Sequence, residues 1–180
     1  GGAGYIGSHT VLALLERGHQ VVVLDNFSNS SPKVMARLEA LAGKPIPLCQ
    51  VDLRDGDTVF DVLVSHKIDA VIHFAALKAV GESCEQPLQY FDNNVSGTIS
   101  LLLAMQKAGV LRFVFSSSAM VYGDTEHETL SENTPRSANN PYGRTKLMIE
   151  EIIEDLCAAD TNFKAAILRY FNPVGAHPSG

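Results

Sequence analysis

Gly1-Gly2-Ala3-Gly4-Tyr5-Ile6-Gly7 opens the chain with glycines at a G-x-x-G-x-x-G spacing, immediately before an apolar pattern of helical period. Gly1 permits a tight turn, Gly4 lets the backbone approach a phosphate, and Gly7 lets the following helix pack closely. Backbone N–H groups and the positive end of the helix dipole then face an anion. The loop therefore predicts binding of a dinucleotide pyrophosphate, with an ordinary helix-entry turn as the alternative.

Asp25 extends this prediction from the phosphates to the ribose. Apolar residues at helical spacing predict a helix over residues 5–17, and the continuous run Val21-Val22-Val23-Leu24 predicts a buried parallel strand that ends at Asp25. A carboxylate there accepts hydrogen bonds from ribose hydroxyls and repels a 2′-phosphate, which favours NAD over NADP. The alternative is that Asp25 only opens the polar turn after the strand.

Helix and strand patterns alternate along the rest of the chain. We expect helices at residues 33–42, 57–66, 94–108 and 142–160, and strands at residues 46–51, 70–76, 112–116 and 164–170. This alternation predicts an α/β fold with a doubly wound parallel sheet and ligands at the carboxyl ends of its strands. The strand that ordinarily precedes such a glycine loop is missing. We therefore expect a gap in the middle of the sheet, and residues 1–180 to be the NAD-binding domain of a longer protein whose C-terminal substrate domain is absent.

Composition narrows the class of protein. The chain has 180 residues, 46% hydrophobic and 19% charged, as in an ordinary globular domain. A net charge of −6 without a basic stripe argues against nucleic acid, and no apolar run is long enough to cross a membrane. Three cysteines without a paired spacing suit a reducing cytoplasm. No histidine, His127 included, has a spacing that suggests a metal site.

Tyr142 and Lys146 form a Y-x-x-x-K pattern at the start of a predicted helix, so both side chains lie on one face. Such a pair alone is usually a surface feature. Here Ser116-Ser117-Ser118 ends the preceding strand, and a serine hydroxyl there can share a proton with Tyr142. A neighbouring cation lowers the phenol pKa from about 10 by about 1–3 units. Tyr142 is thus predicted to take a proton from an alcohol while NAD takes the hydride.

These motifs together resemble the extended short-chain dehydrogenase/reductase superfamily, whose NAD-binding domain has the Rossmann fold. Four longer segments, residues 4–10, 77–83, 115–119 and 168–177, are similar to the UDP-glucose 4-epimerase family. The resemblance covers the whole chain and about half of the family's length. It implies that UDP-glucose and UDP-galactose interconvert through a 4-keto intermediate with tightly bound NAD, as part of galactose metabolism. It also implies a homodimer formed through the helices at residues 94–108 and 142–160.

The resemblance assigns roles to individual residues. Tyr142, assisted by Ser118, is the catalytic base, Lys146 binds the nicotinamide ribose, and Ser118, Tyr142 and Asn172 contact the nucleotide sugar. The cofactor is lined by Ser118, Tyr142, Lys146, Gly1, Gly4, Tyr5, Ile6, Gly7, Asp25, Asn26, Phe27, Ser28, Asn29, Ser30, Asp52, Leu53, Phe74, Ala75, Ala76, Leu77, Lys78, Asn93 and Phe171.

Several of these residues have a purely structural alternative. The segment Phe74–Leu77 ends a buried strand, Asp52, Asn93 and Asn94 are suitable helix caps, and Lys78 is suited to solvent. His73, inside an apolar run, is predicted to be a hydrogen-bonded core residue. The cluster Glu150, Glu151, Glu154 and Asp155 is predicted to be a solvated helix face.

Two rival activities can be weighed on the sequence. A nucleotide-sugar 4,6-dehydratase of the same superfamily needs an Asp-Glu pair just after the serine, where this chain has Ala119 and Met120. A non-catalytic NAD-sensing protein commonly loses the tyrosine or the lysine, whereas this chain keeps Tyr142 and Lys146. The chain also has Ala76 and Met120 where the resembling family usually has glycine and threonine. Neither change removes a reacting group.

Overall fold

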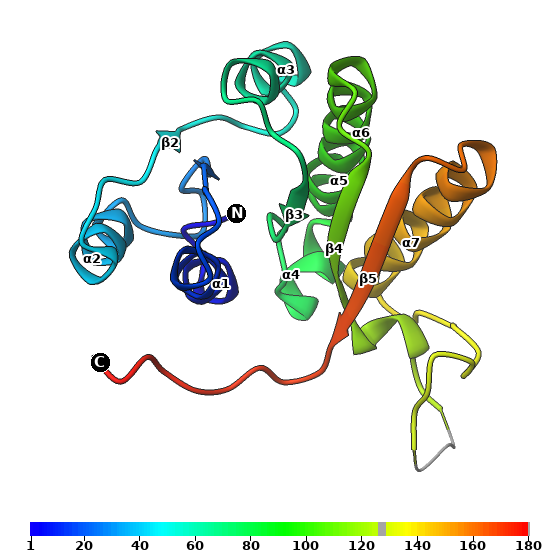
Figure 1. Cartoon of the computed structure of the whole chain (residues 1–180). Coiled ribbons are helices and arrows are strands. Elements are labelled where there is room, and N and C mark those ends of the chain that lie inside the picture. Colours follow the sequence, from blue (N-terminus) through cyan, green and yellow to red (C-terminus); the bar gives the residue numbers. More distant parts are fainter. Residues whose placement is uncertain (126–128, 180) are drawn as a thin grey trace.

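Helices and strands alternate in an α/β fold in the computed structural model, which describes residues 1–125 and 129–179 (Figure 1). His127 therefore lies outside the described residues. The elements are α1 (Tyr5–Glu16), β1 (Val23–Leu24), α2 (Lys33–Ala42), β2 (Leu48–Cys49), α3 (Gly56–Ser65), β3 (Val71–His73), α4 (Val80–Glu85), α5 (Pro87–Tyr90), the π-helical turn η1 (Phe91–Ser96), α6 (Gly97–Ala108), β4 (Arg112–Ser118), the 3₁₀ turn η2 (Ala119–Tyr122), α7 (Pro141–Ala159) and β5 (Lys164–Tyr170).

All strand pairs are parallel, as the alternation predicts, but the strands form two sheets. β1 pairs with β2, and β3, β4 and β5 form a second sheet in that order. Gly1 lies between the two sheets: its nitrogen donates to the Leu24 carbonyl at the end of β1, and a Cβ on Gly1 would lie 2.3 Å from the Ala75 nitrogen beyond β3. The gap expected in the sheet is therefore the space between β1 and β3 (Figure 1).

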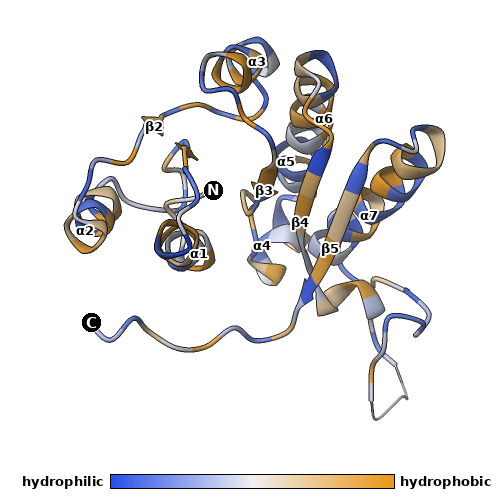
Figure 2. Ribbon diagram, in the orientation of Figure 1, coloured by the Kyte–Doolittle hydropathy of each residue, from blue (hydrophilic) through white to orange (hydrophobic). Residues whose placement is uncertain are grey.

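Each sheet has its own apolar core. The first core packs β1 against α1 and α2, and its buried members include Val11, Leu12, Val23, Met35 and Leu38. The larger core lies between the second sheet and α3, α6 and α7, and includes Met105, Phe113, Phe115, Ile149 and Ile153. Figure 2 shows the apolar colour along β3 and the middle of β4, whereas the helices carry both apolar and hydrophilic colours. Burial of apolar area between the sheets and the helices stabilises both cores.

The helix ends follow the local sequence. Gly43 and Gly109 adopt left-handed φ angles of 66° and 72° and end α2 and α6, as glycine readily does. Asn140 caps α7 by accepting a hydrogen bond from the Gly143 nitrogen at 2.8 Å. Patterning did not predict α4 and α5, because helices of six and four residues are too short to show a period. In the described part of the chain, no helix is long and apolar enough to cross a membrane.

Candidate active site

The glycine loop lies at the carboxyl ends of β1 and β3 and leads directly into α1. Gly4 precedes the helix without a side-chain cap, so the first backbone N–H groups of α1 are not bound by a capping side chain. A Cβ on Gly7 would lie 2.3 Å from the Gly1 carbonyl oxygen, and one on Gly4 would approach that oxygen to 3.4 Å. Gly7 thus permits the close packing of the loop. Because Gly4 has no side chain, the outer side of the loop stays open. The loop has the shape of a phosphate cradle.

Asp25 connects this loop to the turn that follows β1. One carboxylate oxygen accepts from the Ala3 nitrogen at 3.0 Å, and the other accepts from the Phe27 nitrogen and the Ser30 hydroxyl at 2.9 Å each. These bonds hold Phe27 at a left-handed φ of 58°, which is uncommon for a bulky residue. The predicted cofactor residues of this turn therefore share one anchor with the glycine loop.

A second polar cluster adjoins the turn. The Asn26 side chain donates to Asp52 at 3.0 Å, and the Arg54 guanidinium pairs with Asp52 at 2.9 Å and with Asp92 at 2.6 Å. The hydrogen bonds from Arg54 hold the pKa of the Asp52 carboxyl well below its usual range. The alternative role of Asp52 as a helix cap is wrong, because Asp55 caps α3 by accepting from the Thr58 nitrogen.

Ser118 and Tyr142 meet where β4 ends and α7 begins. The Ser118 hydroxyl lies close enough to the Tyr142 phenol to favour the ionised form, and the Tyr142 nitrogen donates to the Ser83 hydroxyl of α4 at 3.2 Å. A Cβ on Gly143 would lie 2.7 Å from the Met120 carbonyl oxygen, so a glycine is needed for α7 to approach this closely. Ser118 also pairs in register with Tyr170 of β5, and Phe171 and Asn172 follow as exposed residues.

Lys146 lies one helical turn beyond Tyr142 and is only 3% exposed. Its ammonium donates to the Ser116 carbonyl at 2.8 Å and lies 4.8 Å from the centre of the Phe115 ring and 6.0 Å from that of Tyr142. Burial lowers the pKa of Lys146 to about 7, although the Glu150 carboxylate opposes this.

The expected lowering of the Tyr142 pKa by a neighbouring cation is wrong for this structure. Burial disfavours the phenolate and raises the pKa of Tyr142 above its ordinary value, and the hydrogen bond with Ser118 only partly offsets this. Lys146 points its ammonium toward the Ser116 carbonyl instead of the phenol oxygen.

Comparisons with known proteins identify the family of this chain. The model of the NAD dependent epimerase/dehydratase family matches residues 1–180. The chain belongs to this family. Among curated epimerases, it is 54% identical to the UDP-glucose 4-epimerase of Bacillus subtilis (strain 168) and 53% identical to that of Dictyostelium discoideum, in each case over the whole chain. These matches cover 53% and 52% of the relatives, so the chain spans about half their length.

Solved epimerase structures have the same fold. The UDP-glucose-4-epimerase of Stenotrophomonas maltophila, with bound NAD and formylated UDP-arabinopyranose, superposes with a TM-score of 0.97 at 51% identity, over 99% of this chain and 53% of that one. The enzyme of Bifidobacterium longum, in complex with NAD+ and UDP, gives a TM-score of 0.96 at 46% identity, with the same coverage.

Asn94, which the sequence suggested only as a possible helix cap, supports the candidate site of this epimerase-family chain. It is 1% exposed within η1, and its side chain binds both the nitrogen and the carbonyl of Leu77, at 2.9 and 3.0 Å. It also donates to the Thr145 hydroxyl at 3.1 Å, which in turn donates to the Tyr142 carbonyl at 2.7 Å. Asn94 thereby connects the predicted cofactor segment Phe74–Lys78 to α7, which carries Tyr142 and Lys146. Asn93, also inside η1, donates to Asn94, so neither residue is the cap of a helix.

His73 is a core residue, as predicted. It is 5% exposed, its ring bonds the Thr98 hydroxyl at 2.9 Å, and it stacks on Phe113 and Phe115 with ring centres 6.0 and 5.9 Å away. Burial lowers its pKa well below the ordinary value, so its ring is neutral at pH 7.

The acidic cluster on α7 is only partly the solvated face that was predicted. Glu151, Glu154 and Asp155 are exposed, but Glu150 is fully buried and pairs with Arg136 and Arg169. Sequence patterning missed it because both arginines are distant along the chain.

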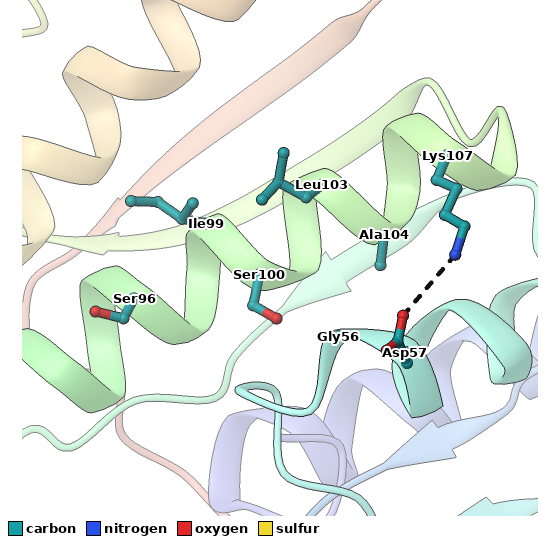
Figure 3. Close-up of a pocket in the computed structure, with 8 residues that line it drawn as sticks. All are labelled: Gly56, Asp57, Ser96, Ile99, Ser100, Leu103, Ala104 and Lys107. Carbon is teal, nitrogen blue, oxygen red and sulfur yellow. Dashed lines mark ion pairs between the residues drawn. The ribbon is translucent and has the colours of Figure 1, made fainter.

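A separate hollow lies outside this site, between α3 and α6 (Figure 3). Asp57 and Lys107 form an ion pair of 3.8 Å across it, and none of the predicted site residues lines it. Within residues 1–125 and 129–179, no group of three or more acidic, histidine or cysteine side chains is placed to hold a metal ion.

Proposed function

We propose that the protein containing this chain is an NAD-dependent UDP-glucose 4-epimerase that interconverts UDP-glucose and UDP-galactose. The carrying observation is that Ser118, Tyr142 and Lys146 converge at the same edge of the strands as the glycine loop. The relatives, at 53–54% identity, carry this name, and related structures contain NAD with UDP or a UDP-sugar. Because the chain spans about half of those relatives, "the whole protein" below means one of their full length.

The site residues fit NAD. The glycine loop is a cradle that side chains would fill, and Asp25, Asn26 and Asp52 supply carboxylate and amide groups next to it. When bound, NAD would accept a hydride from the sugar C4 and return it. The residues proposed to line NAD are the cofactor residues that the sequence predicts. One of them, Leu77, is held in place by the side chain of Asn94.

The chain's own side chains would move the proton. Tyr142 would take the proton of the sugar 4-hydroxyl and later return it, with the Ser118 hydroxyl bonded to the phenol throughout. Lys146 would orient the ribose of the cofactor, and its burial excludes water from the reacting side. Asn172 would contact the nucleotide sugar. Ala119 and Met120 supply no carboxylate for elimination of water, which favours epimerisation over dehydration.

The deciding experiment is to incubate the whole protein with UDP-galactose, without added oxidant or reductant, and to measure UDP-glucose by chromatography. We expect UDP-glucose to form until equilibrium, because hydride removed from C4 returns to C4. Formation of a 4-keto-6-deoxy sugar would instead identify a dehydratase. Retained NAD without any product would identify a non-catalytic NAD-binding protein.

The proposal includes a homodimer that acts in the cytoplasm, in galactose metabolism. Large apolar side chains are exposed on α6 and α7: Ile99 is 40% exposed, Leu103 61% and Met148 41%. Figure 3 shows Ile99 and Leu103 pointing away from α3, so they are available to a second copy. Exposed apolar area of this kind marks interaction surfaces, and symmetric dimers are the commonest oligomers.

Leu103→Glu should convert this dimer to a monomer, because two carboxylates would be buried at the interface of a symmetric pair. Light scattering after size-exclusion chromatography of the whole protein would then show half the mass. Val64→Glu, on the outer face of α3 where Val64 is 52% exposed, is the matched control and should leave the dimer intact. A Leu103→Glu protein that stays dimeric would contradict this interface.

A further inference from the structure

Glu150 is a fully buried carboxylate on α7, one helical turn beyond Lys146 and two beyond Tyr142. Residues four apart lie on the same face of a helix. The three polar groups therefore form one stripe along α7, on the side that faces β4. No step of the proposed reaction uses Glu150 directly.

The carboxylate joins α7 to three other parts of the chain. One oxygen accepts from the Ser117 hydroxyl of β4 and from Nε of Arg169 on β5 at 3.0 Å. The other accepts from Arg169 at 2.8 Å and from Arg136, in the segment before α7, at 3.0 Å. These four bonds keep it charged: although burial raises the pKa of Glu150, the bonds from Arg169, Ser117 and Arg136 outweigh it, and the pKa is lowered.

The network continues from Arg169 to residues that follow Ser118 along the chain. Arg169 donates to the Tyr122 hydroxyl at 2.7 Å, and that hydroxyl donates to the Ser131 carbonyl at 2.9 Å. Tyr122 ends η2, the turn that begins directly after Ser118. Ser117 on one side and Tyr122 on the other thus fix the backbone that carries Ser118.

A buried ion pair contributes little net stability, because desolvation offsets much of its attraction. Because such a pair adds little to stability, the position of the Glu150–Arg169 pair beside the proposed reacting groups indicates a functional role. We propose, on the basis of the epimerase function above, that Glu150 together with Arg169 is a positioning residue. It holds α7 against β4 so that Tyr142 stays opposite Ser118, and it supplies the negative charge that favours the ammonium form of Lys146.

The proposed effect of Glu150 on the charge of Lys146 follows from the groups that surround Lys146. His73 on β3 is neutral because of its burial, Tyr142 on α7 is uncharged, and β4 offers the Ser116 carbonyl as a dipole. The Glu150 anion raises the pKa of Lys146 against the effect of burial. Its removal should therefore favour the neutral amine.

The test compares the whole wild-type protein with Glu150→Gln, which keeps the shape of the side chain but removes the charge. The matched control is Glu151→Gln, the same change at the exposed neighbour on α7. We expect Glu150→Gln to lower kcat by about 10- to 100-fold through misplacement of Tyr142, with KM for UDP-galactose changed less than about threefold. The control should match the wild type in kcat.

The pKa of Lys146 separates positioning from a general loosening of the fold. It can be followed by NMR of the lysine ε-carbons in ¹³C-labelled protein, assigned with Lys146→Arg. Loss of the anion should lower this pKa by about one unit. A loosened fold would admit water and raise it toward its ordinary value. An unchanged or raised pKa in folded Glu150→Gln would overturn the proposal.

Ser117→Ala decides the question if Glu150→Gln does not fold, because it removes only the hydrogen bond to β4. We expect kcat to fall about tenfold, the pKa of Lys146 to stay unchanged, and the unfolding temperature to fall by a few degrees. Wild-type kcat in Ser117→Ala would overturn the positioning role. Failure of the wild type to convert UDP-galactose would contradict the proposed function instead, and the NMR measurement would still test the charge of Glu150.

Discussion

Tyr142→Phe should lower kcat of the whole protein for UDP-galactose by about 1,000-fold, because the phenol oxygen is the proposed proton acceptor and a phenylalanine ring cannot replace it. The change removes one oxygen and leaves the ring, so packing at the start of α7 is preserved. The backbone anchors of this turn, from the Tyr142 nitrogen to the Ser83 hydroxyl and from the Gly143 nitrogen to the Asn140 side-chain oxygen, do not involve the Tyr142 hydroxyl. The measurement is the initial rate of UDP-glucose formation.

The bound NAD content and the unfolding temperature of the Tyr142→Phe protein serve as controls, and both should match the wild type. A variant that retains more than about a tenth of wild-type kcat would show that another group removes the proton. Equal loss of NAD and activity would show that Tyr142 acts mainly in cofactor binding.

Gly7→Ala should abolish NAD retention and also destabilise the fold. The added Cβ would lie 2.3 Å from the Gly1 carbonyl oxygen and 2.8 Å from the Gly2 Cα, both backbone atoms that can move only with the loop. Overpacking of this kind costs about 1–3 kcal/mol in the free energy of unfolding, and the displaced loop no longer presents its N–H groups to the pyrophosphate. Chromatography of nucleotide released from the purified protein measures retention, and urea unfolding measures stability.

Gly81→Ala is the matched control, since a Cβ there meets nothing within 4 Å in α4. It should keep NAD and be at least as stable as the wild type, because alanine favours a helix by about 1 kcal/mol over glycine. If Gly7→Ala retained stoichiometric NAD, the loop would not be the pyrophosphate site.

Much of the fold could be predicted from the sequence because it depends on local patterns. The helix at residues 33–42 and the strand at residues 164–170 have the predicted bounds. β1 and β2 are shorter than predicted, two residues each, because they pair in register only at Val23 with Leu48 and at Leu24 with Cys49. Strand length depends on pairing, and pairing partners are distant in sequence.

The candidate site likewise contains residues that local sequence patterns reveal and residues that they do not. Gly7, Tyr142 and Lys146 could be recognised from their spacing, since the motif itself sets the local geometry. Glu150 could not, because its neighbours on α7 are solvated acids and the arginines that neutralise it lie on β5 and on the segment before α7.

The sequence by itself determined the alternation of helices and parallel strands, the glycine loop and the choice of the residues proposed to react, because periodicity and motif spacing act over a few residues. Only the tertiary structure decided the charge states and the supports of the site. Burial raises the pKa of Tyr142 and lowers that of Lys146, and Asn94 and Glu150 are connected to the candidate site through partners far along the chain. Desolvation and long-range hydrogen bonds depend on which segments meet in space, and local sequence patterns do not carry that information.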